Sequence, residues 1–169
     1  HSGGYQLKRV FFKFDTRGVT IAPSSTNVVI YFNTPVSGDY ILVKADEFGA
    51  ALETSEFGGI TNRPGTGTYN GVVTDFSSNF TPGPTQYVTV SLKSNALTQI
   101  GVSGESLNVC LLNYTFDYLN GSPDTSPTAQ AAIVTNDFPG TTFDIKLDYV
   151  EGSAGRAKAA GGTFSREEL

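Results

Sequence analysis

The chain has 169 residues, among them 12 Phe, 8 Tyr and 19 Gly but no Trp or Met, and 16% of its residues are charged. This length can supply one domain with its own hydrophobic core, and the formal net charge of −5 excludes nucleic acid as an expected partner, because such proteins need a basic patch to neutralise phosphates. The sequence contains no run of about 18 apolar residues, so we expect no membrane-spanning helix and no membrane partner.

The first part of the chain predicts two strands. In the stretch RVFFKF (9–14), successive side chains of an extended segment alternate between two faces. The face of Val10, Phe12 and Phe14 is expected to enter a core. The opposite face carries Arg9, Phe11 and Lys13. Because that face is mostly polar, we expect it to lie in solvent. The stretch TNVVIYF (26–32) then has the β-branched and aromatic residues of a buried strand.

The rest of the chain predicts further strands and one helical turn. The strand ranges are 40–45, 72–76, 85–92, 106–116, 129–135 and 141–150. Residues 94–101 predict a helical turn that Gly101 ends. The only cysteine, Cys110, lies in an apolar strand and is expected to be a small buried hydrophobe. Beyond Glu151 the composition becomes small and polar without a core pattern, so residues 152–169 are expected to form a flexible tail.

These elements together predict an all-β protein. We expect residues 1–151 to form a single-domain, jelly-roll-like antiparallel β-sandwich with one short helical turn, followed by the tail. The order of RVFFKFDT, TNVVIYF, DYILVKADEFGAALETSEFGG, YNGVVTDFSSNF, YVTVSLKSNALTQI and FDIKLDYVEG resembles the DNRLRE-like β-sandwich modules, which are related in architecture to jelly-roll carbohydrate-binding modules. The resemblance covers roughly residues 1–152, and it implies a module of secreted cell-wall proteins, adhesins or phage structural proteins.

The chain departs from that family pattern at its start. Members usually have an additional strand region before the segment equivalent to Tyr5, and this chain has none there. An unpaired sheet edge is a template for another chain, so a neighbouring copy could donate a strand from residues 1–7 or from the tail. Alternatively, the domain has fewer strands, or the missing strand belongs to a longer chain.

Catalysis has little support in the sequence. The only histidine is His1, so a nucleophile–histidine arrangement is not expected, and no spacing of Cys and His fits a zinc site. A carboxylate pair for glycoside hydrolysis stays open, because the sequence does not show which of the 16 acidic residues meet. We therefore predict a protein that is not an enzyme and needs no cofactor.

Two groups of residues are candidates for binding. Five aromatic rings in polar, glycine-rich stretches could lie flat against a sugar or a partner surface: Phe48, Phe57, Tyr69, Phe80 and Tyr118. Each ring could instead pack into the end of the sandwich, because apolar rings gain most by burial. Four acidic residues crowd one long connection and could hold a structural Ca²⁺ through oxygen ligands: Asp46, Glu47, Glu53 and Glu56.

The function expected from these features is a structural or adhesive module on an extracellular or virion surface. It would be a phage fibre, spike, decoration or filament subunit that assembles with copies of itself or with other virion or appendage subunits. A secreted carbohydrate-binding module that recognises a surface glycan is the alternative, and a fragment of a glycan-active enzyme is a third.

Overall fold

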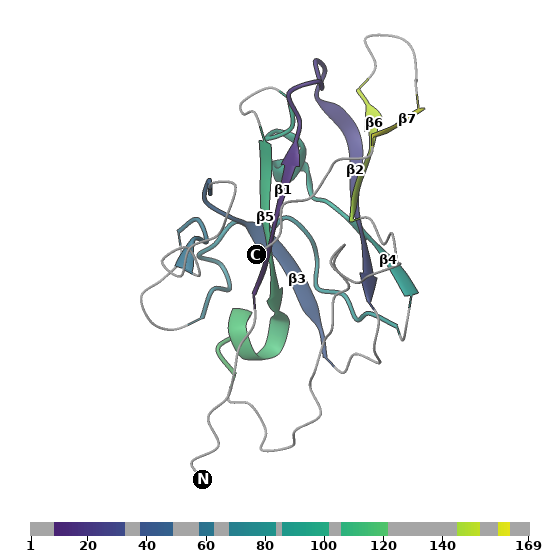
Figure 1. Ribbon diagram of the computed structural model, residues 1–169. Coiled ribbons are helices and arrows are strands. Elements are labelled where there is room, and N and C mark those ends of the chain that lie inside the picture. The colour runs from purple at the N-terminus through teal and green to yellow at the C-terminus, as the bar shows by residue number, and fades with distance from the viewer. Residues whose placement is uncertain are drawn as a thin grey trace.

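The computed structural model describes residues 9–32, 38–48, 58–62, 68–83, 86–101, 106–121, 145–152 and 159–162 (Figure 1). Two antiparallel sheets account for its strands. Sheet A has the order β1-β5-β3, formed by Val10–Asp15, Ser106–Asn113 and Tyr40–Lys44. Sheet B has the order β4-β2-β6-β7, formed by Gln86–Ser91, Pro23–Phe32, Lys146–Glu151 and Ala159–Gly162. The predicted all-β sandwich is therefore confirmed.

The chain changes sheet after every strand from β1 to β6, so strands that follow one another in the sequence lie in opposite sheets. The two short helices lie at the ends of strands. The helix α1 (Ser94–Leu97) follows β4 as predicted, and the π-helix η2 (Tyr114–Tyr118) directly continues β5. The expected strand 106–116 therefore ends at Asn113, where the Asn113 side-chain oxygen accepts a hydrogen bond from Phe116 N at 2.8 Å. In Figure 1, η2 is the green helix below β3 and β5.

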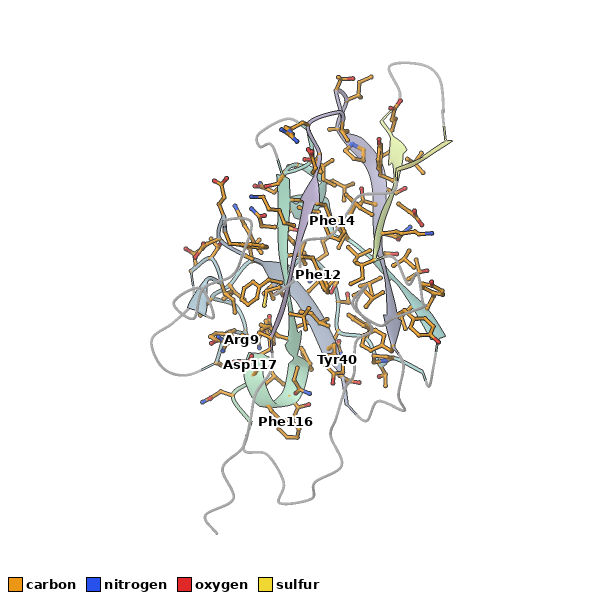
Figure 2. All side chains as sticks on the ribbon, viewed as in Figure 1. Arg9, Phe12, Phe14, Tyr40, Phe116 and Asp117 are labelled. Carbon is orange, nitrogen blue, oxygen red and sulfur yellow. The ribbon has the colours of Figure 1, made fainter. Side chains whose placement is uncertain are left out.

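The main core fills the space between the sheets. Phe12 and Phe14 of β1 enter it as predicted, and Figure 2 shows both rings on the side of β1 that faces sheet B. Sheet B contributes alternate residues of β2, and Leu147 contributes from β6. The alternation of apolar and polar residues in these strands thus produces a single buried layer, as the period of two residues requires.

A second hydrophobic cluster covers the outer face of sheet A. Phe11 and Cys110 point away from the main core, yet both are buried, together with Ile41 and Val43 of β3. The prediction that the outward face of β1 lies in solvent was wrong, because segments far along the chain pack over it. In Figure 1 these segments lie to the left of sheet A and below it.

Two smaller expectations are corrected. Residues 72–76 form no strand of their own, and among them Asp75 makes one isolated bridge, to Val43 of β3. Within the expected tail, Ala159–Gly162 form β7 and pair antiparallel with β6, since small residues can pair through the backbone without any hydrophobic pattern. The predicted strand 129–135 lies outside the described residues. In the described part of the chain, no helix has the length and apolar character needed to cross a membrane.

Candidate functional site

The two outer faces of the sandwich differ, and this difference locates the candidate site. The outer face of sheet A is covered by the chain itself. Lys13 of β1 donates a hydrogen bond from Nζ to Phe48 O at 2.9 Å, and the Phe11 and Phe48 rings meet edge to face at 5.9 Å. Further along, Tyr69 N donates to Tyr118 O at 2.8 Å, which joins one covering loop to the end of η2. This face therefore belongs to the interior.

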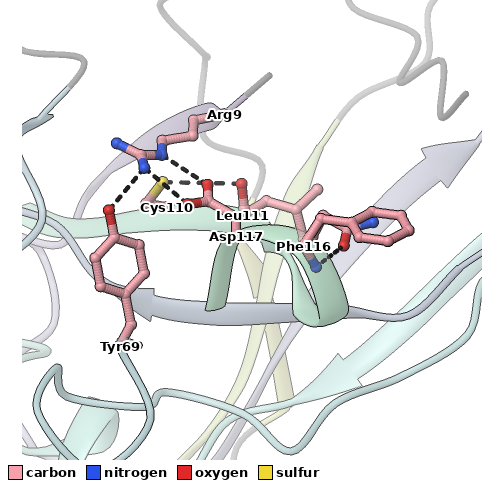
Figure 3. A network of polar contacts seen from close by, with 7 residues as sticks. Arg9, Tyr69, Cys110, Leu111, Phe116 and Asp117 are labelled. Carbon is pink, nitrogen blue, oxygen red and sulfur yellow. Dashed lines mark hydrogen bonds and ion pairs between the residues drawn. The ribbon is translucent and has the colours of Figure 1, made fainter. Parts of the chain in front are cut away.

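A buried ion pair lies at the centre of the covered face (Figure 3). Arg9 donates from Nε to Asp117 Oδ2 and from Nη2 to Asp117 Oδ1, both at 2.7 Å, which is the two-pronged geometry of the strongest Arg–carboxylate contacts. Its Nη2 also donates to Tyr69 Oη at 2.7 Å. Both charged side chains are only 4% exposed. The network ties the start of β1 to η2 and to the loop around Tyr69.

Burial and pairing act in opposite directions on the charge of Arg9. Burial lowers the pKa of the guanidinium, but the hydrogen bonds and the charge of Asp117 outweigh it, so the pKa of Arg9 lies above its usual value. Cys110 lies beside this pair and is fully buried, and burial raises the pKa of its thiol well above the usual range. Its predicted character as a buried hydrophobe is confirmed. The Arg9 and Asp117 charges of this network are therefore paired with each other, and the neighbouring Cys110 thiol is held in its protonated form.

A second polar group holds η2 to the segment that follows Tyr69. The Tyr118 hydroxyl donates to Asp75 Oδ1 at 2.8 Å, and Lys93 Nζ approaches the other Asp75 oxygen at 3.5 Å. Burial and the hydrogen bond to Asp75 both raise the pKa of Tyr118. The Tyr118 ring stacks on Tyr114 with centroids 5.3 Å apart. This ring is therefore a packing element of the second cluster.

The structure places the five candidate aromatic residues in different settings. Phe48, Tyr69 and Tyr118 are buried in the second cluster, so none of them presents a free ring face to a ligand. Phe80 is partly buried against the main core, with its ring 6.4 Å from that of Tyr40. Phe57 lies outside the described residues. The structure therefore does not bring these rings together into one exposed surface.

The candidate calcium ligands are only partly described. Asp46 and Glu47 are exposed, and Asp46 Oδ1 accepts a hydrogen bond from Thr61 Oγ1 at 2.7 Å. Glu53 and Glu56 lie outside the described residues. Within the part of the chain that the structure describes, no three His, Cys, Asp or Glu side chains are grouped in a way that could hold a metal ion.

The outer face of sheet B is the open one. We call its outward-facing side chains on three strands the open face: Ser25, Asn27, Val29 and Tyr31 of β2, Tyr87, Thr89 and Ser91 of β4, and Lys146, Asp148 and Val150 of β6. Every one of these residues is exposed or partly exposed. Val150 is among the most exposed large apolar residues of the described chain. This face has therefore kept the access to solvent that sheet A has lost.

An aromatic pair stands out on the open face. Tyr31 and Tyr87 are direct partners across β2 and β4, and their rings meet at 63° with centroids 4.9 Å apart. Tyr87 is 47% exposed, which is unusual for a ring that gains by burial. Four residues along the same strands, Ser91 Oγ donates to Asn27 Oδ1 at 2.8 Å. Rings at one end and hydroxyl and amide groups at the other thus line one face.

The sequence carried a signal for this surface. Tyr87, Thr89 and Ser91 alternate with apolar residues in the predicted strand 85–92, so an outward tyrosine could be predicted there. Tyr31 lies in a stretch whose residues predict a continuous buried strand, so its partial exposure could not be predicted from the sequence.

No family model, no curated protein and no solved structure matches the chain.

Proposed function

We propose that this chain is a non-enzymatic structural or adhesive module of an extracellular or virion surface, such as a fibre, spike, decoration or filament subunit. The proposal is supported by the contrast between the two sheets. Sheet A is covered on both faces, with a paired Arg9–Asp117 network inside. Sheet B keeps one face open, so the module offers one side to its surroundings.

The edge of sheet B supports assembly with further copies. In the described part of the chain β4 pairs only with β2, so it is an edge strand. Its sequence QYVTVS has no charged residue and no proline, the two devices that most often protect an edge from pairing with another chain. Its residues also have high β-propensity. A second copy could therefore extend sheet B by pairing with β4, as in other strand-addition complexes.

The test is the mass of the purified chain in solution, measured by light scattering over a dilution series and followed by electron microscopy. We expect dimers, rings, trimers or filaments that dissociate on dilution. Thr89→Lys places a charge on the β4 edge strand and should shift the series towards monomer, whereas Thr20→Lys, at an exposed site before β2, should not. A monomer at every concentration would overturn assembly.

Two deletions separate edge pairing from strand donation. Removing residues 1–7 or 163–169, which leaves β7 in place, abolishes assembly only if one of these segments is the donor. Assembly that survives both deletions but is lost in Thr89→Lys assigns the contact to β4. Assembly that survives all three changes would contradict the β4 edge as the contact.

A further inference from the structure

We propose that Asn70 is a site of spontaneous chemical modification, at which the side chain deamidates through a cyclic imide formed with the backbone nitrogen of Gly71. The chain has two Asn–Gly pairs, Asn70–Gly71 and Asn120–Gly121. The structure distinguishes them by the contacts of the glycine nitrogen. The inference concerns the loop that covers sheet A, and it does not depend on the proposed function.

The reaction needs only water. The backbone nitrogen of the glycine loses its proton to hydroxide and attacks the Cγ atom of the asparagine carboxamide. A bond forms between this nitrogen and Cγ, and the side-chain nitrogen takes up a proton and leaves as ammonia. Water then adds to one of the two carbonyl carbons of the imide and opens the ring to aspartate or isoaspartate. Glycine favours the attack because it has no side chain to hinder the approach of its nitrogen.

Exposure alone does not separate the two pairs, because Asn70 and Asn120 both have exposed side chains. Asn70 lies in a turn that Val72 N closes by donating to Tyr69 O at 3.0 Å. Asn120 lies just beyond the end of η2. The difference between the two sites is therefore to be found at the glycine that follows each asparagine.

The nitrogen of Gly121 is held by the fold. It donates to Thr115 O at 2.9 Å, and this bond caps the end of η2. A Cβ at Gly121 would lie 2.7 Å from the same oxygen, so the chain passes close to η2 at this point. Attack on Asn120 would break the capping bond and leave the Thr115 carbonyl without its partner. The cap therefore protects the second pair.

The nitrogen of Gly71 is held less firmly. Gly71 has φ +73°, as the third position of a turn favours, and a Cβ there would meet open space. Among the described residues its N–H has no backbone acceptor and donates to the Tyr118 hydroxyl. This hydroxyl keeps its own bond to Asp75 Oδ1 at 2.8 Å when Gly71 moves away, so no buried group is left without a partner.

The two reacting groups also lie on the same side of the turn. The Tyr118 hydroxyl that accepts from Gly71 N lies 3.4 Å from Asn70 Oδ1. The carboxamide and the attacking nitrogen thus adjoin one oxygen atom. The structure therefore assigns Asn70, and not Asn120, as the asparagine that deamidates in the folded chain.

The product weakens the cover of sheet A. A new carboxylate at residue 70 faces the Tyr118 hydroxyl, which already donates to Asp75. One hydroxyl proton cannot serve two carboxylates, and like charges around it repel. Isoaspartate also lengthens the backbone of the turn next to Tyr69, whose hydroxyl accepts a hydrogen bond from Arg9. Modification at Asn70 therefore loosens the loop that closes over the outer face.

The experiment compares the two asparagines in the native and the denatured chain. The full chain is incubated at pH 8 with and without guanidinium chloride, and peptide mass spectrometry follows the modified fraction at each site. In the native chain Asn70 should deamidate at least about fivefold faster than Asn120, the factor that one hydrogen bond of about 1 kcal/mol supplies. In denaturant the two rates should be similar, because a glycine in an unfolded chain follows both asparagines. Asn70→Gln, whose longer side chain closes the ring more slowly, should remove most of the native modification, whereas Asn120→Gln should not.

The effect on the fold is measured with Asn70→Asp, which should lower the melting temperature of the parent chain. Thr20→Asp is the matched control, because it adds the same charge at an exposed site in the β1–β2 connection, at the far end of the molecule from η2 (Figure 1). Equal melting temperatures for Asn70→Asp and the parent would contradict the loosening of the cover.

Three outcomes of the incubation would overturn the assignment. They are faster modification of Asn120 in the native chain, protection of both sites there while both react in denaturant, and a ratio of rates that denaturant leaves unchanged. Light scattering of the same samples reports assembly separately, so none of these outcomes bears on the module proposal.

Discussion

Asp117→Asn tests whether the covered face of sheet A depends on its buried ion pair. The substitution keeps the shape of the side chain but removes the charge that faces the Arg9 guanidinium. Both side chains are 4% exposed, and two hydrogen bonds of 2.7 Å join them. Removing one partner of such a pair leaves an uncompensated charge in the interior, which costs about 3–5 kcal/mol of unfolding free energy.

This loss is large enough to measure by thermal unfolding. For a chain of this size, 1 kcal/mol shifts the melting temperature by about 2–4 °C, so Asp117→Asn should lower it by about 6–20 °C. The matched control is Asp15→Asn, which removes the carboxylate of the exposed Arg17–Asp15 pair, whose side chains are 67% and 49% exposed. Water screens that pair, so the melting temperature should hardly change.

The double variant Arg9→Met/Asp117→Leu completes the test, because it removes both charges together. It should destabilise the protein less than Arg9→Met and Asp117→Leu do in sum, since neither charge is left buried alone. The reasoning is refuted if Asp117→Asn and Asp15→Asn lower the melting temperature equally. Strict additivity in the double variant would equally show that the two side chains are not coupled.

Three further predictions use other parts of the structure. Gly101 has φ +72°, and a Cβ there would meet a backbone carbonyl of the β1–β2 connection, so Gly101→Ala should lower the melting temperature clearly while Gly18→Ala, which has open space, should not. The Cys110 thiol is buried with a raised pKa, so a thiol reagent at pH 8 should label it only as fast as the protein unfolds, and rapid labelling of the native chain would contradict this. Side-chain and backbone hydrogen bonds from Arg17 lower the pKa of Asp15 from 3.8 to about 2. Because the pair is exposed and screened by water, its contribution to stability is small; the sign is stabilising above pH 3.8, and the contribution is lost as pH falls towards 2. An NMR titration should show the low midpoint and its return towards 3.8 in Arg17→Ala.

The main core could be predicted because its signal is local. Alternation in the stretch that forms β6 places Leu147 inside and Asp148 outside, and the structure has both there. The same rule placed Phe12 and Phe14 between the sheets. Each of these assignments depends only on the period of two residues along one strand, which the sequence shows directly.

The covered face could not be predicted because its signal is not local. Arg9 stands in an alternating strand, where a basic residue normally indicates solvent. Its partner Asp117 is 108 residues away, in a stretch whose own pattern suggests a loop. Arg9 is buried because the fold brings the Asp117 carboxylate next to it, and the local sequence around neither residue indicates this contact. The second cluster was therefore missed along with the ion pair.

The burial of the candidate rings could not be predicted for a related reason. Tyr69 and Tyr118 lie in polar, glycine-rich stretches, and this pattern describes only the chain next to each ring. Burial of a ring is decided by what packs on it, and here the loop of Tyr69 hydrogen-bonds to the Tyr118 carbonyl and closes over sheet A. Tyr87 lies in a regular strand, where only the alternation of inward and outward residues indicates that it faces outward.

The outward residues of one strand in each sheet account for the asymmetry of the whole module. Arg9, directly before β1, binds Asp117 of η2, and Lys13 of β1 binds the Phe48 carbonyl, so each of these side chains holds a covering segment in place. On β2, the outward residues Val29 and Tyr31 lie beside their cross-strand neighbours on β4 and β6. Substitutions on the outer face of sheet A should therefore lower the melting temperature, because they release a covering segment, whereas substitutions on the open face should change it little. Measuring the melting temperature in one set of variants drawn from both faces would test this difference, and equal losses on the two faces would contradict it.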